Sequence, residues 1–207
     1  MIAAVILAAG HSSRMGRTKA LLPHRDGVTS FVRHAITQAT SAGLKTVLVV
    51  GREGDVELER EVAAAGATFI ANEEPDRGQL SSLLAAMDAL ESHHHLVDSV
   101  LVLPVDVPLV SANVLRTVVL VSDGTAAPIV RAAHLGVHGH PVVFKRQIFA
   151  ELRAADPVLG AKAVVRADPS RVVDVEVNDP AVLLDVDTPA DYQRLFGRPL
   201  PDTDLPR

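Results

Sequence analysis

The chain of 207 residues has no cysteine, no tryptophan and a single tyrosine, and aromatic residues make up only 3% of it. Without cysteine, disulfides, thiolate metal sites and cysteine nucleophiles are excluded. So few aromatic rings also argue against a stacking platform for single-stranded nucleic acid. The core must therefore be built from valine, leucine, isoleucine and alanine, which supply most of the 48% hydrophobic content.

The chain also lacks an excess of positive charge and any long apolar run. Its formal net charge is −5, which disfavours a broad surface for phosphate backbones but leaves room for a local basic pocket. The apolar start ends at Gly10 without a preceding basic segment, so it is interpreted as a strand rather than a signal peptide. No stretch approaches the length of a membrane span. We expect a cytoplasmic protein with neither nucleic acid nor membrane as a partner.

Short β-branched runs alternate with alanine-rich stretches of helical length, which predicts a three-layer α/β/α fold. The first runs are apolar almost throughout, as in strands covered on both faces, and this indicates a Rossmann-like, mostly parallel sheet. The later strands are shorter and crowded, so we expect an antiparallel segment or an edge hairpin there. Strands are expected at residues 3–7, 46–50, 68–71, 100–103, 127–130, 141–144, 172–177 and 183–186. Helices are expected at residues 30–41, 56–65, 80–92, 112–121, 146–154, 160–167 and 189–196.

No internal repeat or long linker divides the chain, and its length suits one domain. We expect a single domain over residues 1–197 and a flexible tail over residues 198–207, where three prolines follow Gly197.

The loop after the first expected strand combines small and basic residues. In a doubly wound sheet, ligands bind beyond the carboxyl ends of the strands, where this loop lies. Residues 8–10 are Ala-Ala-Gly, so their backbone N–H groups can approach a ligand closely, while Arg14 and Lys19 can hold phosphate oxygens. The loop matches neither a P-loop nor a dinucleotide-binding glycine turn. On residue chemistry alone, an anion-binding loop and a flexible solvated turn both remain open.

The motif L-A-A-G-x-S-x-R-M-G-x-x-K resembles the signature loop of nucleotidyltransferases with a MobA-like NTP transferase domain. The resemblance implies a sheet of the nucleotide-diphospho-sugar transferase type. It also implies that small residues of the loop wrap the base and ribose while the two cations hold the triphosphate. The nucleotide-binding residues implied for this loop are Leu7, Ala8, Ala9, Gly10, Arg14 and Lys19. Ser13 offers no cation, and we assign it no catalytic role.

A second stretch, G-Q-L-S-S-L, is similar to the G-x-x-S-S-L segment that these enzymes use against the base. It opens an expected helix, so its N–H groups point toward the cleft. Helix capping is the alternative role, and the two roles are compatible. The resemblance adds Gly78, Gln79, Ser81 and Ser82 to the nucleotide-binding residues.

Three aspartates lie near the ends of expected strands. Asp106 stands between two prolines after residues 100–103, where a hard oxygen ligand suits Mg²⁺ bound to nucleotide phosphates and a loop cap is the alternative. Asp185 and Asp187 would share one face of the last expected strand, where like charges need a nearby cation. By resemblance, Asp106 and Asp187 are the metal ligands and Asp185 is a weaker candidate. The residues that follow are explained as a helix cap: Thr188, Pro189 and Asp191.

Later motifs narrow the resemblance to the molybdenum cofactor cytidylyltransferases. G-H-P-V-V-F, L-G-A-K-A-V and the D-V-D-T-P ending resemble stretches of these enzymes, and the resemblance runs over residues 2–195. The G-[HN]-P-V-x-F stretch belongs to the acceptor side of their cleft, which implies acceptor-binding roles for Gly139, His140 and Pro141. The Ala-Ala-Gly form of the first loop resembles members that transfer cytidylate rather than guanylate.

The resemblance implies Mg²⁺-dependent nucleotidyl transfer, with Arg14, Lys19 and Asp106 as catalytic residues. The favoured reaction moves CMP from CTP to the phosphate of molybdenum cofactor and releases pyrophosphate, with handover of the product to a molybdoenzyme or its chaperone. The alternatives are a sugar 1-phosphate acceptor, GTP as donor, and a nucleotide-binding sensor without turnover. A pure sensor would not need both carboxylates, which disfavours it.

Two groups of histidines are set aside as metal sites. His93, His94 and His95 close an expected helix and are interpreted as a solvated helix end. His134 and His138 have the spacing of a helical zinc pair, but the glycines between and after them disfavour a helix.

Overall fold

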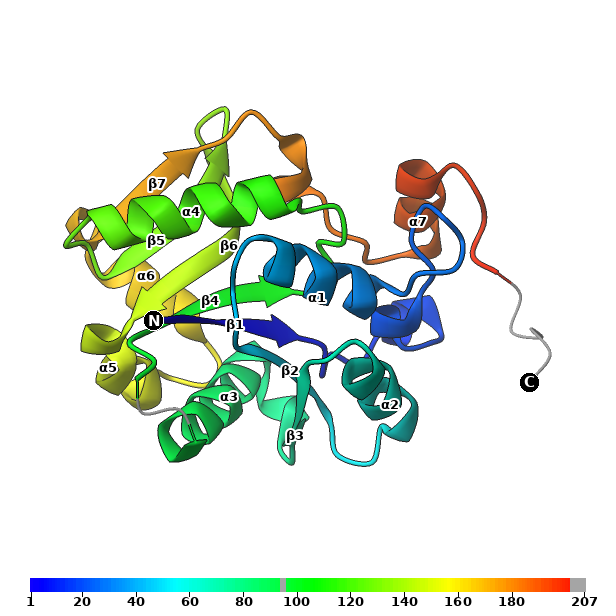
Figure 1. Cartoon of the computed structure of the whole chain (residues 1–207), viewed down its shortest axis with the longest axis horizontal. Coiled ribbons are helices and arrows are strands. Elements are labelled where there is room, and N and C mark those ends of the chain that lie inside the picture. Colours follow the sequence, from blue (N-terminus) through cyan, green and yellow to red (C-terminus); the bar gives the residue numbers. More distant parts are fainter. Residues whose placement is uncertain (94–95, 202–207) are drawn as a thin grey trace.

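The structure, a computed structural model, describes residues 1–93 and 96–201. In this part of the chain one mixed sheet of seven strands has the order β3-β2-β1-β4-β6-β5-β7, with helices on both faces (Figure 1). Only β6 runs antiparallel to its neighbours β4 and β5; the other described pairs are parallel. The strands are β1 (Ile2–Leu7), β2 (Val47–Arg52), β3 (Thr68–Asn72), β4 (Ser99–Pro104), β5 (Ile129–His134), β6 (Val137–Lys145) and β7 (Val172–Glu176).

The helices form two layers that bury different faces of the same strands. In β1, Ile2, Ala4 and Ile6 face one core, while the alternate residues face the other. One layer contains α1 (Phe31–Ser41), α2 (Val56–Ala64), α4 (Ala112–Gly124) and α7 (Pro189–Phe196). The opposite layer contains α3 (Gln79–His93), α5 (Phe149–Ala154) and α6 (Ala161–Ala167). The expected three-layer α/β/α architecture is confirmed.

Several helices begin where a side chain satisfies the free amides of the first turn. Ser30, Asp55 and Ser111 each accept a hydrogen bond from the backbone N–H three residues ahead, at the starts of α1, α2 and α4. Thr188 and Asp191 form a reciprocal capping box at the start of α7, with Pro189 as its first residue. The cap expected from the sequence is therefore confirmed.

The last expected strand, residues 183–186, is wrong. The short helix η6 (Pro180–Leu183), with the Asp179 side chain accepting from the Ala181 N–H, ends at the first of these residues, and an irregular segment follows it. The alternating L-L-D-V letters imitate a strand, but proline and its aspartate cap start a helical turn first.

The expected antiparallel segment is confirmed, and it lies inside the sheet. β5 and β6 form a hairpin whose turn has Leu135 at φ 50° and Gly136 at φ 75°. β7 pairs with the outer side of β5, so β7 is the edge. β6 is longer than expected because Gly139 continues it: a Cβ there would lie 2.0 Å from the Val182 carbonyl oxygen.

At the other end of the molecule α7 packs on α1 and on the loop that ends at Pro23. The Tyr192 hydroxyl donates to the Pro23 carbonyl at 2.7 Å, and the Tyr192 ring stacks on Phe31 and Phe196. Arg198, in the expected tail, donates to the His24 carbonyl; residues 202–207 of that tail lie outside the described residues.

Over the described ranges, 1–93 and 96–201, every helix is too short or too polar to cross a membrane.

Candidate active site

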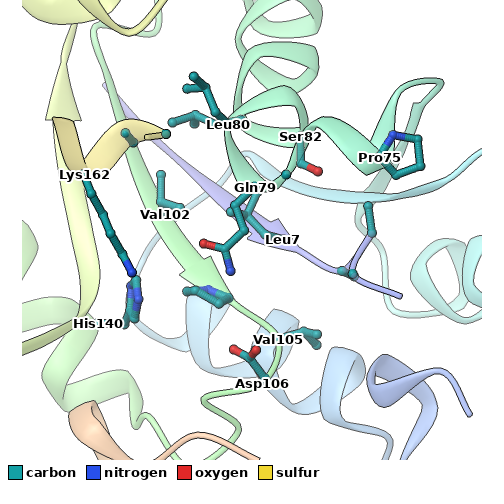
Figure 2. Close-up of a pocket in the computed structure, with 18 of the residues that line it drawn as sticks. Leu7, Pro75, Gln79, Leu80, Ser82, Val102, Val105, Asp106, His140 and Lys162 are labelled. Atoms are coloured by element: carbon teal, nitrogen blue, oxygen red, sulfur yellow. The ribbon is translucent and has the colours of Figure 1, made fainter. Parts of the chain in front are cut away.

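A cavity of about 830 Å³ opens beyond the carboxyl ends of β1 and β4, the point where the strand order reverses. It has two walls. The carboxylate wall consists of the loop of residues 7–19, the start of α3, and the aspartates Asp106, Asp185 and Asp187. The β6–α6 wall consists of pocket-lining residues from β6, from α6 and from the segment 157–160. Figure 2 shows part of both walls, with His140 and Lys162 on one side and Asp106, Leu7 and Gln79 on the other.

The loop after β1 presents backbone to the cavity because its residues are small and its turns are tight. Ala8 and Ala9 are buried and line the cavity together with Gly10. Ser12, at φ 48°, accepts from the Met15 N–H through its carbonyl and from the Lys19 N–H through its hydroxyl. These bonds fold the loop back on itself, so that Lys19 points into the carboxylate wall.

Lys19 joins the two aspartates that the sequence places far apart. Its Nζ lies 2.6 Å from Asp187 Oδ1 and 3.6 Å from Asp106 Oδ2. Arg14 adds a contact of 3.0 Å between its Nη2 and Asp187 Oδ2. The side chain of Lys19 is 12% exposed and that of Arg14 is 67% exposed. The structure thus brings Arg14, Lys19, Asp106 and Asp187 into one network.

The backbone holds the two aspartates in register. The Val186 N–H donates to the Asp106 carbonyl at 2.8 Å. The capping carboxylate of Asp191 accepts from the backbone N–H groups of Asp187 and Thr188. Asp187 is therefore fixed by the first turn of α7 and by the end of β4, and not by a strand of its own.

Burial and neighbouring charges shift the pKa values of Asp106 and Asp187 in opposite directions. Burial raises the pKa of Asp106, with Asp187 and Asp185 adding to the effect and Lys19 opposing it. The hydrogen bond from Lys19 lowers the pKa of Asp187, and Arg14 adds to that lowering. Asp106 is thus a buried carboxylate whose charged form Lys19 stabilises only in part.

A divalent cation fits this donor set. Mg²⁺ keeps several waters and takes one or two carboxylates together with substrate phosphates. Asp106 and Asp187 both reach one ammonium, so a cation in that region lies within reach of both. No group of three or more metal-ligating side chains occurs in the described part of the chain, so substrate oxygens and water would complete the coordination.

The start of α3 places most of the nucleotide-binding residues predicted in the G-Q-L-S-S-L stretch at the cavity. Gly78, Gln79 and Ser82 line the cavity, whereas Ser81 does not. Both serine hydroxyls lie 2.9 Å from the Asn72 side-chain amide, at the end of β3. Ser81 therefore holds the carboxyl end of β3 against α3, and its contact with a nucleotide stays a prediction.

Of the three predicted acceptor residues, only His140 lines the cavity. Gly139 packs against the Val182 carbonyl, where a side chain has no room. Pro141 is buried and follows a cis peptide bond. Burial and then the charge of Lys162 lower the pKa of His140 to about 4, so its ring is neutral at pH 7.

Sequence reasoning missed several residues of the cavity. His11 pairs with Asp76 at 2.6 Å across the mouth. Lys162 and the segment 157–160 form much of the β6–α6 wall, and the L-G-A-K-A-V motif was the signal that pointed there. The weaker candidate Asp185 does line the cavity.

Of the histidines set aside, His134 and His138 stay outside the cavity lining. His134 lies in β5 with Nδ1 2.9 Å from the Val177 carbonyl, and His138 lies in β6. They are strand residues and not a helical pair, in agreement with the expectation from Gly136 between them and Gly139 after them. His94 and His95 lie outside the described residues.

Known proteins share this architecture and about a quarter of the aligned residues. The chain is 28% identical over 190 residues to the molybdenum cofactor cytidylyltransferase of Escherichia coli strain K12, covering 91% of this chain and 92% of that one. The crystal structure of Rv0371c from Mycobacterium tuberculosis H37Rv superposes with a TM-score of 0.78 at 27% identity, covering 95% of this chain and 98% of that one. A complex of Rv0371c with manganese superposes with a TM-score of 0.69 at 28% identity, with the same coverage.

The family model of the MobA-like NTP transferase domain matches residues 4–172. That range contains the first loop, the start of α3, Asp106 and Lys162, and Asp187 follows it. With the cavity at the switch point of the sheet, the match assigns the chain to a family of nucleotidyltransferases: it belongs to the MobA-like NTP transferase domain family.

Proposed function

We propose that this protein transfers CMP from CTP to the terminal phosphate of molybdenum cofactor and releases pyrophosphate. One observation carries the choice among nucleotidyl transfers: similarity to the Escherichia coli cytidylyltransferase over nine-tenths of both chains. The network of Arg14, Lys19, Asp106 and Asp187 supports the reaction type, because it concentrates phosphate-binding cations and metal-binding carboxylates in one cavity.

In this reaction an oxygen of the acceptor phosphate attacks the α-phosphorus of CTP. The bond between the α-phosphorus and the bridging oxygen to the β-phosphate breaks, and pyrophosphate leaves with that oxygen. The attacking phosphate is already an anion, so the protein needs no general base. Positioning and neutralisation of charge can supply the rate.

The chain's own residues divide this work. The backbone of residues 8–10 faces the base and ribose, and Arg14 and Lys19 exchange their contacts with Asp187 for contacts with the triphosphate. Asp106 and Asp187 would hold Mg²⁺, which orients the α-phosphate and neutralises the growing charge when it is bound. The manganese complex of Rv0371c supports a divalent metal in this fold.

The pairing of cations with carboxylates explains how the cavity keeps its shape before the nucleotide arrives. Each cation that moves to a phosphate uncovers a carboxylate, and the carboxylate is then free for the metal. Nucleotide and metal are therefore expected to bind together, each strengthening the other.

The test is a screen for pyrophosphate release with each of the four NTPs against molybdenum cofactor and sugar 1-phosphates, in the presence of Mg²⁺. CTP with molybdenum cofactor should give the highest kcat/KM. A higher value with GTP or with a sugar phosphate would replace the proposed substrates but keep the reaction. Nucleotide binding without pyrophosphate release from any pair would indicate a sensor.

A further inference from the structure

Lys162 is a cation of the cavity that the proposed reaction has not used. It lies at the start of α6, lines the cavity and is exposed. Arg14 and Lys19 both pair with aspartates. By contrast, the Lys162 side chain has no hydrogen bond or ion pair with any residue in the part of the chain that the structure describes.

The Lys162 side chain points toward His140 (Figure 2), and its charge lowers the pKa of that histidine. His140 Nδ1 is buried and has no hydrogen-bond partner among the residues that the structure describes. An unpartnered buried polar atom is costly, and a ligand is one way to satisfy it. A lysine without a carboxylate beside a neutral imidazole without a partner forms a site for a group that carries negative charge and several hydrogen-bonding oxygens.

The rest of the β6–α6 wall is apolar. It has no acidic residue among its described cavity-lining members, which are Val142, Phe144, Pro157, Val158, Leu159, Gly160, Ala161 and Val165. Val158 is 92% exposed and Leu159 62% exposed, so two large apolar side chains stand at the mouth with little protein against them.

A local turn fixes this mouth. The Asp156 side chain accepts from the Val158 N–H at 2.7 Å, and its carbonyl accepts from the Gly160 N–H at 2.9 Å. The one carboxylate of the turn is thereby engaged outside the cavity lining, and the apolar side chains are held at its entrance.

We infer that Lys162 and His140 bind the phosphate of the acceptor, and that the apolar mouth beside them selects a flat, ring-bearing phosphate monoester over a sugar 1-phosphate. This inference rests on the proposed function for the direction of transfer. Sugar hydroxyls need carboxylate or amide partners, which this wall lacks, whereas a ring face packs on Val158 and Leu159. Arg14 and Lys19 already pair with Asp187 in the carboxylate wall. Lys162 is therefore the cation available for the phosphate of the acceptor.

The first measurement is steady-state pyrophosphate release with Lys162→Met, which keeps the length of the side chain and removes its charge. The KM for molybdenum cofactor should rise about tenfold to a hundredfold, as expected for loss of a charge-assisted contact, while the KM for CTP stays within about twofold. Lys45→Met is the matched control. Lys45 is an exposed lysine just before β2, at the end of the sheet opposite the cavity, and the same substitution there should change neither constant.

The histidine is tested by two variants of similar size. His140→Asn keeps a polar group near the position of Nδ1 and should retain most of the affinity for the acceptor. His140→Leu should raise the acceptor KM about tenfold with little effect on the KM for CTP. Equal losses in both variants, with early unfolding, would mean that His140 serves the fold and would remove it from the site.

A binding measurement separates this inference from the proposed function. The wild-type protein, loaded with Mg²⁺ and a non-hydrolysable α,β-methylene analogue of CTP, is titrated with molybdenum cofactor and with glucose 1-phosphate by calorimetry. Tighter binding of the first ligand, lost in Lys162→Met, supports the site even if pyrophosphate release shows another donor to be preferred. Equal binding in wild type and Lys162→Met, no binding of either phosphate, or a weakened CTP analogue in Lys162→Met would each overturn the inference.

Discussion

The two walls of the cavity hold their charges in different ways. In the carboxylate wall Lys19 and Arg14 already contact Asp187, and backbone bonds lock the aspartates to the ends of β4 and α7. In the β6–α6 wall Lys162 has no described partner and the apolar residues at the mouth are exposed. A wall whose charges neutralise one another is stable without ligand and binds by exchanging partners. A wall with an unpaired cation and bare apolar groups gains its partners only from the ligand.

The supports behind the walls differ as well. Three of the chain's few aromatic rings, Phe31, Tyr192 and Phe196, stack behind the carboxylate wall, where α7 meets α1. Tyr192 is fully buried, and its hydroxyl ties α7 to the end of the first loop at Pro23. The helix that begins after Asp187 is therefore braced against the segment that carries Lys19. This brace explains how two parts of the chain far apart in sequence can place their charges within hydrogen-bond distance.

The largest expected effect comes from changing the two aspartates of the carboxylate wall that we propose as metal ligands. Asp106→Asn and Asp187→Asn should each reduce kcat by about a thousandfold or more, in the range seen when a group that stabilises transition-state charge is removed. Each amide keeps the size of the side chain, so the fold should persist. Pyrophosphate release at saturating Mg²⁺ measures the first effect and circular dichroism checks the second. Full activity in either variant would exclude the two-carboxylate metal site.

The two cations of the carboxylate wall, Lys19 and Arg14, should have similar effects on CTP binding but different effects on stability. Both Lys19→Met and Arg14→Met should weaken CTP binding or transfer about tenfold to a hundredfold, because each loses a charge-assisted contact with phosphate. The sequence places both on a loop, which predicts little effect of either on thermal unfolding. The structure separates them, because Lys19 is nearly buried between two carboxylates and Arg14 is exposed.

Thermal unfolding decides this separation. Lys19→Met leaves the buried Asp106 without its cation and Asp187 with Arg14 alone, which should cost about 1–3 kcal/mol, equivalent to roughly 2–4 °C in Tm for each kcal/mol. Arg14→Met should leave Tm unchanged. Addition of Mg²⁺ should recover part of the loss in Lys19→Met. Identical melting of the two variants would show that the wall is not held together by its charges.

Acid should weaken the brace behind the carboxylate wall through the stacked pair His24 and His34. His24 and His34 stack with ring centroids 3.9 Å apart, and burial and then the charge of His24 lower the pKa of His34 to about 4. Burial also lowers the pKa of His24, although Nε2 lies 3.1 Å from the Pro108 carbonyl. Among the charged groups that face the stack, Arg25 and Arg198 disfavour its protonation and Asp26 favours it.

The direction in which stability changes with pH depends on whether the folded or the unfolded state binds more protons. Below the unfolded value of 6.5, the unfolded chain takes up protons that folded His34 refuses until the pH is about 4, so stability falls as pH falls through this window. Urea unfolding at pH 7 and pH 5 should show this loss in the wild type and a smaller one in His34→Gln. An equal loss in both would assign the acid sensitivity to other groups.

How much of this could be predicted depends on whether the signal is local in sequence. The first loop and the start of α3 are recognisable because close approach of backbone to a ligand requires small residues next to one another, as in Ala8, Ala9 and Gly10. The fold class could also be predicted, because apolar periodicity is likewise a pattern among residues close together in the sequence. The strand expected at residues 183–186 failed because its letters alternate as in a strand, whereas a proline-started turn and a single bond from Val186 to Asp106 determine its path.

The role of Lys162 and the bridge from Lys19 to Asp106 and Asp187 could not be predicted from local sequence alone. A lysine in a helix has the same local pattern whether it faces water or a cavity. The L-G-A-K-A-V motif pointed to the segment, but the role of Lys162 follows from its surroundings in the fold: it lies near the unpartnered Nδ1 of His140 and pairs with no carboxylate in the described part of the chain. The same holds for His11 and Asp76, which meet across the mouth from segments that carry no shared motif.

The smallest expected effect concerns the choice of base. Ala9 is 4% exposed and lines the cavity between β1 and the start of α3, so its methyl group narrows the slot where a base would lie. A purine is larger than a pyrimidine, and the methyl should therefore favour CTP over GTP. Differences of one methyl group in a pocket are worth about 1–3 kcal/mol, and we expect the lower end here, so Ala9→Gly should reduce the preference for CTP about fivefold. The measurement is kcat/KM for the two nucleotides in direct competition, with molybdenum cofactor as acceptor, and Ala8→Gly serves as the matched control on the same loop.

If Ala9→Gly leaves the ratio unchanged, the preference comes from hydrogen bonds to the edge of the base, for which Gln79 and Ser82 in the same wall are the nearest side chains. If the wild type itself prefers GTP, the methyl group does not select the base and the proposed donor is wrong.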